Sequence, residues 1–151
     1  MKLNRAIEES IAKSVLCWLA TVSASGMPNV SPKEVFTHFE EDSIIIANIA
    51  SPNTMKNIRA NEQVCVSFID VLVQKGFQLK GKATIVEKSD TAFAPMEAKL
   101  LEMTKGRFPF ATITKIRVES AKPIVAPSYV FYPKDTTEAQ QIENARKIYQ
   151  I

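Results

Sequence analysis

Glycine and histidine are scarce in this 151-residue chain, which has four glycines and one histidine. Neither GxGxxG nor GxxxxGK[ST] occurs, so the common nucleotide-binding loops are excluded. The single histidine, His38, excludes a multi-histidine metal site, and no Asp/Glu/His cluster has metal-ligand spacing, so we expect no metal. A Ser-His-Asp triad would depend on His38 alone, and a surface histidine near a strand end is the more frequent case.

Cysteine is also rare. Cys17 and Cys65 lie in apolar, strand-like runs, and neither belongs to a CxxC or Cys/His pattern. We interpret both as buried free thiols. This interpretation argues against a disulfide scaffold and against a zinc centre.

Blocks of like charge and long apolar runs are missing as well. The net charge is +3, and Lys and Arg are scattered through the sequence, which argues against a nucleic-acid partner but leaves a small anionic ligand possible. No apolar run approaches membrane-spanning length, and the first residues lack the apolar centre of a signal peptide. We therefore expect a cytoplasmic protein that has no membrane partner.

The composition is that of an ordinary globular protein, with 46% hydrophobic and 23% charged residues. We predict a single domain covering residues 1–151. Its strand-rich core is expected at about residues 15–126, and a C-terminal helix at about residues 137–150.

Hydrophobic periodicity predicts six strands and four helices. The strands are expected at residues 15–23, 27–39, 43–50, 63–73, 76–88 and 111–126. The first three helices are expected at residues 3–14, 52–61 and 89–105. The fourth is the C-terminal helix, which begins with a capping-box pattern at Thr137 and Gln140. Residues 127–133 are expected to form a loop.

The arrangement of these elements favours an antiparallel sheet. Residues 76–88 alternate strictly between apolar and polar, as in a strand with one face exposed. Pro28 and Pro32 cannot donate to a ladder, so residues 27–39 should form an edge strand or a bulged one. We predict a mainly β fold, a closed or nearly closed antiparallel barrel with helices at its edges, because strands and helices do not alternate regularly.

The sequence Ser51-Pro52-Asn53-Thr54 after the apolar run at residues 44–47 is the strongest candidate for a ligand site. Free N–H groups at a helix start attract anions, and Asn57 lies one turn after Thr54 on about the same face. The alternative is an ordinary helix cap at Ser51, with Asn57 facing water.

Several pieces of sequence, taken in order, resemble the FMN-binding split-barrel family related to pyridoxamine 5'-phosphate oxidase. The pieces are LATVSASGMPNVSPKEVF, IIIANIASPNTMKNIRANEQVCVSF and GFQLKGKATIV, across roughly residues 15–86. They contain a strand ending in Ala-Thr-Val, a Gly-x-Pro-Asn hairpin, Ser-Pro-Lys, a Thr-x-x-Asn helix start and a Gly-x-Gln-Leu-x-Gly strand.

The resemblance implies a six-stranded Greek-key split barrel that forms a homodimer, with FMN at the subunit interface. It also implies that the helix beginning near Ser51 receives the FMN phosphate. The cofactor-binding residues that it implies are Val30, Ser31, Pro32, Lys33, Ala47, Asn48, Ser51, Asn53, Thr54, Asn57, Gln78 and Lys80.

Two positions depart from the family pattern. Asn53 stands where many relatives have Lys or Arg, so Lys33 or Lys56 would have to supply the missing cation. The C-terminal region contains Arg146 but no histidine, whereas true pyridoxamine phosphate oxidases have an arginine-histidine signature there. We therefore do not expect pyridoxamine phosphate oxidation.

The sequence identifies no catalytic acid or base, so a bound cofactor would have to supply the reactive atoms. Our leading hypothesis is an FMN-dependent oxidoreductase with a reduced nicotinamide as a candidate reductant. The non-enzymatic alternatives are a flavin carrier or sensor, and a barrel that has kept the dimer and lost the cofactor. A further alternative is the same fold with a deazaflavin or with haem ligated by His38. The segment Tyr129–Tyr132 could cover the neighbouring subunit's flavin or simply pack at an interface.

Overall fold

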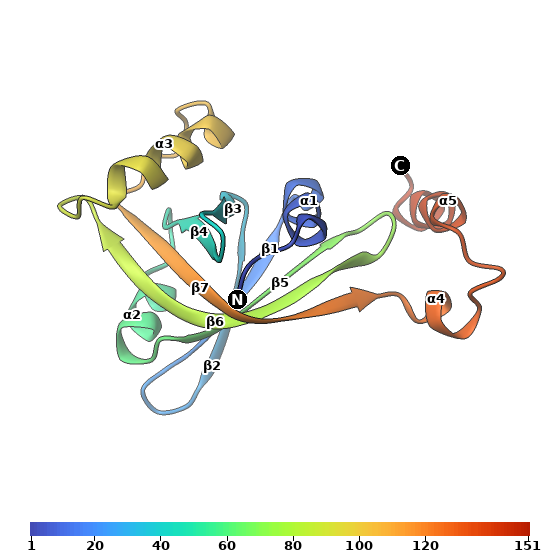
Figure 1. The fold of residues 1–151 in the computed structure, drawn as a ribbon, viewed down its shortest axis with the longest axis horizontal. Helices are drawn as coiled ribbons and strands as arrows, with labels where there is room; N and C mark the ends of the chain where they lie inside the picture. The colour runs from blue at the N-terminus through green and yellow to red at the C-terminus, as the bar shows by residue number, and fades with distance from the viewer.

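A computed structural model describes residues 1–151, and a single antiparallel sheet forms the body of the protein (Figure 1). Its seven strands follow the order β2-β1-β5-β6-β7-β4-β3. The strands are β1 (Cys17–Val22), β2 (Pro28–Lys33), β3 (Phe36–Phe39), β4 (Ser43–Ala47), β5 (Gln63–Asp70), β6 (Lys75–Glu87) and β7 (Thr112–Val125).

The predicted mainly β, antiparallel split-barrel fold is confirmed, but the sheet has seven strands where we expected six. Residues 27–39 form two strands, because pairing with β1 ends at Lys33 opposite Cys17 and pairing with β4 begins at Phe36 opposite Ile46. β2 and β3 are therefore the two edges of the sheet. The expectation that the prolines lie on an edge strand is confirmed, since both are in β2.

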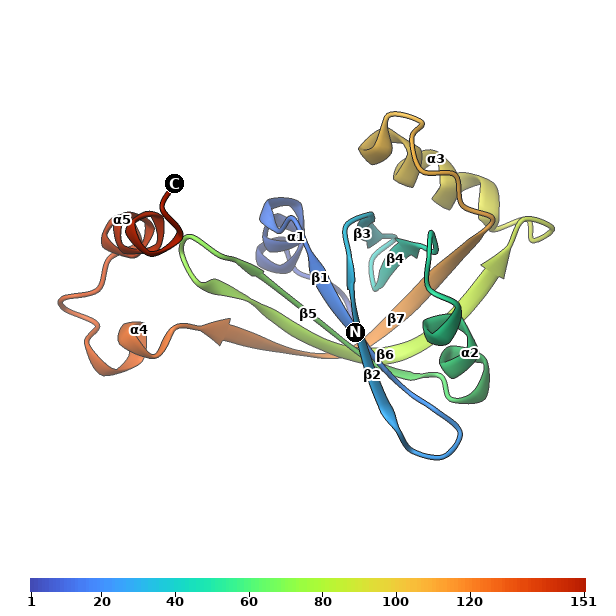
Figure 2. The same ribbon diagram turned by 180° about the vertical axis from the view of Figure 1, so that it is seen from behind.

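The sheet curls because its two longest strands, β6 and β7, bend across the whole body (Figures 1 and 2). Their register shifts between Lys80 and Gly81, as in a β-bulge. A Cβ atom on Gly81 would lie 2.1 Å from the carbonyl oxygen of Arg117, so only glycine permits this close approach. Only Glu34 and Val35 separate the edge strands β2 and β3 along the chain, so the curl must bring the two edges of the sheet close together in space.

Five helices accompany the sheet. They are α1 (Arg5–Lys13), α2 (Pro52–Ala60), α3 (Phe93–Thr104), α4 (Pro127–Phe131) and α5 (Glu138–Tyr149). Helix α1 buries Ile7 and Ile11 in the larger core, which also contains Phe36 and Phe68. Helix α3 covers the smaller core with Phe93, Met96 and Leu100. Met103, which was expected on the same apolar stripe, is 47% exposed, so the prediction was wrong for this residue.

The segment at residues 127–133, which we predicted as a loop, contains α4, because Pro127 presets the helical φ at its first position. The capping box at Thr137 and Gln140 is present as predicted. Figures 1 and 2 show that α4 and α5 lie beyond the distal end of β7 and that α5 lies beside the turn between β5 and β6. Tyr129 donates to the carbonyl oxygen of Val73 in this turn at 2.8 Å, and the Gln141 amide donates to Gln74 at 3.2 Å. We refer to residues 127–151 as the C-terminal arm.

Two further expectations concern the burial of the two thiols and the length of the apolar helices. Cys17 is buried as expected, whereas Cys65 is partly exposed on the outer face of the sheet, so our expectation of two buried thiols was wrong for Cys65. None of the helices has both the length and the apolar character needed to cross a bilayer.

Candidate functional site

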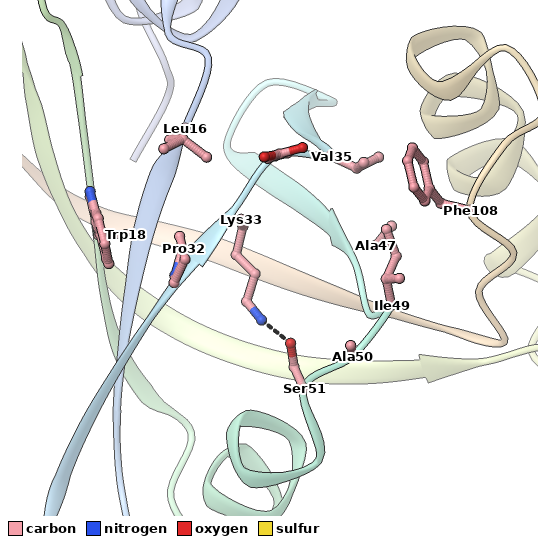
Figure 3. A pocket seen from close by; sticks show the side chains of 11 residues that line it. Leu16, Trp18, Pro32, Lys33, Val35, Ala47, Ile49, Ala50, Ser51 and Phe108 are labelled. Atoms are coloured by element: carbon pink, nitrogen blue, oxygen red, sulfur yellow. Dashed lines mark hydrogen bonds between the residues drawn. The ribbon is translucent and has the colours of Figure 1, made fainter.

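A cavity of about 410 Å³ lies where the chain passes from one edge of the sheet to the other. The ends of β2 and β4 and the start of α2 converge on it, and the loop between α3 and β7 reaches it from another side (Figure 3). The Ala47 amide donates to the carbonyl oxygen of Val35 at 3.0 Å, and this bond holds the end of β4 against the two residues that link β2 to β3. The lining residues are Leu16, Trp18, Pro32, Lys33, Glu34, Val35, Ala47, Ile49, Ala50, Ser51 and Phe108.

Lys33 is the main polar group of this cavity. Only 6% of the residue is exposed, and its ammonium group donates to the hydroxyl of Ser51 (Figure 3). It forms no ion pair with any carboxylate. Burial lowers the pKa of Lys33. Because a buried charge without a counter-charge is costly, this side of the cavity favours an anion.

The neighbouring thiol does not provide that counter-charge. Cys17 pairs directly with Lys33 across β1 and β2. Burial raises the pKa of Cys17 to about 12, so the thiol is neutral at physiological pH. Lys33 is therefore left with a hydroxyl as its hydrogen-bond partner.

Helix α2 presents its N-terminus next to Lys33. Ser51 is its N-cap, but the Ser51 side chain makes no capping bond and accepts from Lys33 instead. The N–H groups of Asn53 and Thr54 have no backbone acceptor, and the first turn contains no acidic residue. These groups and the helix dipole favour a negative charge.

A second contact joins β2 to the same turn. The hydroxyls of Ser31 and Thr54 lie 3.1 Å apart, within hydrogen-bonding distance. Four side chains that the sequence predicted as cofactor-binding are thus brought together at the start of α2. We call this group the α2 cradle, and its members are Ser31, Lys33, Ser51 and Thr54.

Two predicted asparagines are engaged within the protein. Asn48 donates to the hydroxyl of Thr112 at 3.2 Å and accepts from Thr114 at 2.9 Å. Asn57 donates to the hydroxyl of Thr21 at 3.0 Å. Both asparagines are buried and neither lines the cavity, so here they fix the end of β4 and the position of α2.

The remaining predicted residues are dispersed. Pro32 and Ala47 line the cavity, and Asn53 is exposed on the first turn of α2. Val30, Gln78 and Lys80 do not line it. Direct cross-strand pairs connect Pro32, Trp18, Ser67 and Gln78 in one row, and Val30, Ala20, Cys65 and Lys80 in a second row.

Because directly paired residues point to the same side of a sheet, these two rows form one face, opposite to the core. We call it the outer sheet face. Gln78 and Lys80 lie on it three strands away from β2, which is too far to line the cavity of the same chain. Trp18 and Val30 are 48% and 56% exposed on this face.

Sequence reasoning missed much of the apolar wall of the cavity. Trp18 could have been found, because it is out of phase with the buried residues Cys17 and Leu19 on the same strand. Phe108 had no such signal, since it reaches the cavity from the loop after α3 with a positive φ of 57°.

The single histidine and the C-terminal aromatic residues lie elsewhere. His38 is on β3 opposite Ile44 and does not line the cavity. No group of His, Cys, Asp and Glu in the chain could hold a metal ion. Tyr129–Tyr132 belong to the C-terminal arm and do not reach this cavity.

Comparison with known families gave one match over most of the chain. A family model described as pyridoxamine 5'-phosphate oxidase matches residues 3–132. No curated protein gave a significant match to the sequence.

Solved structures of several bacterial proteins are similar to this chain. A candidate pyridoxamine 5'-phosphate oxidase from Lactobacillus delbrueckii is 26% identical, with a TM-score of 0.65 over 80% of this chain and 93% of its own. An FMN-binding protein from Syntrophomonas wolfei is 16% identical, with a TM-score of 0.66 over 81% and 88%. HutZ, the haem storage protein from Vibrio cholerae, is 23% identical, with a TM-score of 0.62 over 83% and 95%. At these identities, the last two similarities are similarities of fold.

Proposed function

Because the chain belongs to the pyridoxamine 5'-phosphate oxidase family, we propose that it binds FMN in the cavity beside α2 and acts as an FMN-dependent oxidoreductase. The observation that carries this proposal is Lys33, a buried ammonium group that faces the N-terminus of α2 and has no carboxylate partner. A phosphate dianion at this point would supply the missing negative charge, so the residues present fit the group.

Each part of the cavity has a proposed role. Lys33, Ser51 and the free N–H groups of α2 hold the phosphate, and Ser31 and Thr54 keep β2 against the helix. The apolar wall, which includes Pro32, excludes water from the flavin ring. Bound FMN would supply the redox chemistry through its isoalloxazine ring.

We further propose that the working unit is a homodimer. Gln78 and Lys80 cannot reach the cavity of their own chain, but they share the outer sheet face with Val30 and Pro32. A two-fold axis that packs this face against its copy would bring them to the partner's cavity. A lone subunit in sedimentation velocity, with FMN bound, would argue against this arrangement.

The substrate is proposed to be something other than pyridoxamine 5'-phosphate, since the C-terminal region contains no histidine. A reduced nicotinamide is the proposed electron donor. The second candidate function is a non-catalytic flavin carrier. It is favoured by one observation, that Lys33 and Glu34 are the only charged residues lining the cavity. A haem protein with a histidine ligand is not favoured, because His38 does not line the cavity.

Titration of the apoprotein with FMN and with riboflavin tests the proposal. We expect one FMN per chain, and we expect riboflavin, which lacks the phosphate, to bind at least about tenfold more weakly. Equal affinity would mean that the α2 cradle does not hold the phosphate, and absence of FMN binding would refute the proposal. Reduction of the bound flavin by NADH or NADPH would then distinguish the oxidoreductase from the carrier.

A further inference from the structure

A second hollow, of about 360 Å³, adjoins the candidate cofactor cavity beside the end of α3. The two share Glu34, Val35 and Phe108 as lining residues. Figure 3 shows Phe108 and Trp18 on opposite sides of the cofactor cavity, so the second hollow lies on the side away from Trp18. None of its residues belongs to the outer sheet face that the proposed dimer covers. We call it the α3 hollow, and its remaining lining residues are Met103, Thr104, Lys105 and Arg107.

Positive charge predominates in the lining of the α3 hollow. Lys105 and Arg107 are exposed, and neither forms an ion pair. Glu34 is the only carboxylate in the lining, and because it is unpaired as well, it neutralises neither cation. The hollow therefore offers an ammonium group and a guanidinium group to an anion.

The loop that carries these cations has an unusual backbone. Lys105, Gly106 and Phe108 have positive φ angles of 52°, 77° and 57°. Lys105 is the C-cap of α3, and helices often end in this conformation. Phe108 is not at a helix end, and a bulky side chain seldom adopts a positive φ because of its steric cost. Such strained residues are concentrated at ligand sites, and Phe108 is in the wall that the two hollows share.

The end of α3 provides an alternative explanation for the two cations. The C-terminus of a helix favours positive charge, and α3 has no basic residue in its last turn. This explanation accounts for the charges of Lys105 and Arg107. It does not account for the strained backbone of Phe108 or for the connection between the hollow and the cofactor cavity.

We infer that the α3 hollow binds the anionic group, a phosphate or a carboxylate, of a small molecule whose other end enters the cofactor cavity past Phe108. Arg107 would donate to two oxygens of that group, and Lys105 would supply a second positive charge. Glu34 would repel the anion and so keep it on the side of Arg107. The assignment of this molecule as the reaction partner of the flavin rests on the proposed function. The anion site itself rests on the hollow alone.

Amide NMR spectra of the nitrogen-15-labelled protein test this inference residue by residue. The probes are inorganic phosphate and acetate, titrated at constant ionic strength against sodium chloride, without flavin and then with FMN present. We expect saturable shifts of the Gly106 and Arg107 amides with at least one probe. Tighter binding of phosphate would identify the ligand's group as a phosphate, and tighter binding of acetate would identify it as a carboxylate. The amides of Asn53 and Thr54 report separately on phosphate at the α2 cradle.

Two variants should change the affinity for the anion in opposite directions. Arg107→Gln should weaken binding at least about tenfold, because it removes a charge-assisted hydrogen bond. Glu34→Gln should tighten binding about two- to fivefold, because it removes a like charge at the surface. Lys88→Gln is the matched control and should leave the affinity unchanged, since Lys88 is exposed, unpaired and outside the hollow. Shifts that do not saturate, or that are equal in all four proteins, would overturn the inference and leave the cations as partners of the helix end.

A parallel FMN titration separates this inference from the proposed function. Arg107→Gln should change the affinity for FMN less than about twofold, because Arg107 does not line the cofactor cavity. Saturable shifts of the Gly106 and Arg107 amides in a protein that does not bind FMN would refute the proposed function and support the anion site. FMN binding without such shifts would overturn the inference and leave the proposed function in place.

Discussion

Lys33 donates a hydrogen bond to Ser51, although the two residues are 18 positions apart and belong to the end of β2 and the start of α2. This contact joins the edge of the sheet to the N-terminus of a helix. It places a buried ammonium group, the free N–H groups of a helix turn and a hydroxyl around one point. The chemistry that we propose for this protein depends on that point.

Lys33→Met should weaken FMN binding while preserving the fold. Methionine keeps the unbranched, apolar part of the side chain but removes the charge. A hydrogen bond between charged groups contributes about 1.5–3 kcal/mol, so we expect the dissociation constant to rise about 10- to 100-fold. Quenching of flavin fluorescence on titration measures the change.

The flavin-free Lys33→Met protein should be at least as stable as the wild type, because the variant no longer buries an uncompensated charge. Lys56→Met is the matched control, since Lys56 is exposed on α2, the helix whose N-terminus Lys33 faces. It should affect neither binding nor stability. If the two variants lose FMN affinity equally, the phosphate does not lie at Lys33.

The lowered pKa of Lys33 also predicts a pH dependence of stability. Burial moves this pKa below its ordinary value of 10.5, so between the two values the unfolded chain binds more protons than the folded one. The free energy of unfolding therefore rises with pH in that window. We expect any stability advantage of flavin-free Lys33→Met over the wild type to shrink as the pH approaches 10.5.

Urea unfolding of both proteins, at several pH values from neutral up to that limit, measures this difference. A difference that does not vary with pH would contradict the prediction. FMN binding should show the opposite trend, weakening as the pH rises through the pKa of Lys33, because the phosphate needs the charged amine.

Asn57→Ala should destabilise the protein, because the Asn57 amide is the donor to the buried hydroxyl of Thr21 at 3.0 Å. Leaving a buried polar group without its partner costs about 1–3 kcal/mol. Chemical denaturation measures the loss. Asn53→Ala, at an exposed position of the same helix, should change the free energy of unfolding by less than about 0.5 kcal/mol.

A double-mutant cycle separates the hydrogen bond from the lost packing. Thr21→Val removes the hydroxyl and keeps the shape of the side chain. If the bond matters, Asn57→Ala combined with Thr21→Val should cost less than the sum of the two single variants. Strict additivity would show that the contact contributes nothing.

The C-terminal arm should be loosened by Lys75→Met, which removes one of its contacts with the turn between β5 and β6. Lys75 forms an ion pair with Glu138 at 2.8 Å, and its amine lies 4.4 Å from the centre of the Tyr129 ring. We expect faster limited proteolysis around residues 127–137, with an unchanged global unfolding transition, because the arm is mostly exposed. Lys147→Met is the control, since Lys147 pairs with Glu143 within α5 and does not reach the sheet.

Lowering the pH should loosen the C-terminal arm, as Lys75→Met does. The hydrogen bond from Lys75 lowers the pKa of Glu138, so the ion pair is lost as the pH falls through that lowered pKa. Proteolysis of the wild-type arm should therefore accelerate in acid, while Lys75→Met should show a smaller change. Equal acceleration in both proteins would exclude Glu138 as the responsible group.

Local patterns predicted the features whose residues are close together in sequence. Ser51 followed by Pro52 predicted the start of α2, and Thr137 with Gln140 predicted the capping box of α5. Both are local hydrogen-bonding or φ preferences, so a few residues contain the information. The apolar stripe of α1, and that of α3 as far as Leu100, were predicted for the same reason.

Contacts between distant segments were harder to predict. The break at Glu34 and Val35 was missed, because it depends on which strands the neighbouring residues pair with and not on their own preferences. Asn57 illustrates the same difficulty. Its position on α2 suggested a contact with a ligand, but its side-chain amide donates a hydrogen bond to Thr21 on β1.

The order of residues thus fixed the kinds of element, the antiparallel class of the sheet and the family, because periodicity and local preferences act over a few positions. The curl of the sheet decided which side chains meet. It brings Phe108 and Val35 to the same cavity and Lys33 against Ser51, and it leaves Gln78 outside that cavity. These outcomes depend on strand pairing and on the bulge at Gly81, and both are properties of the whole sheet.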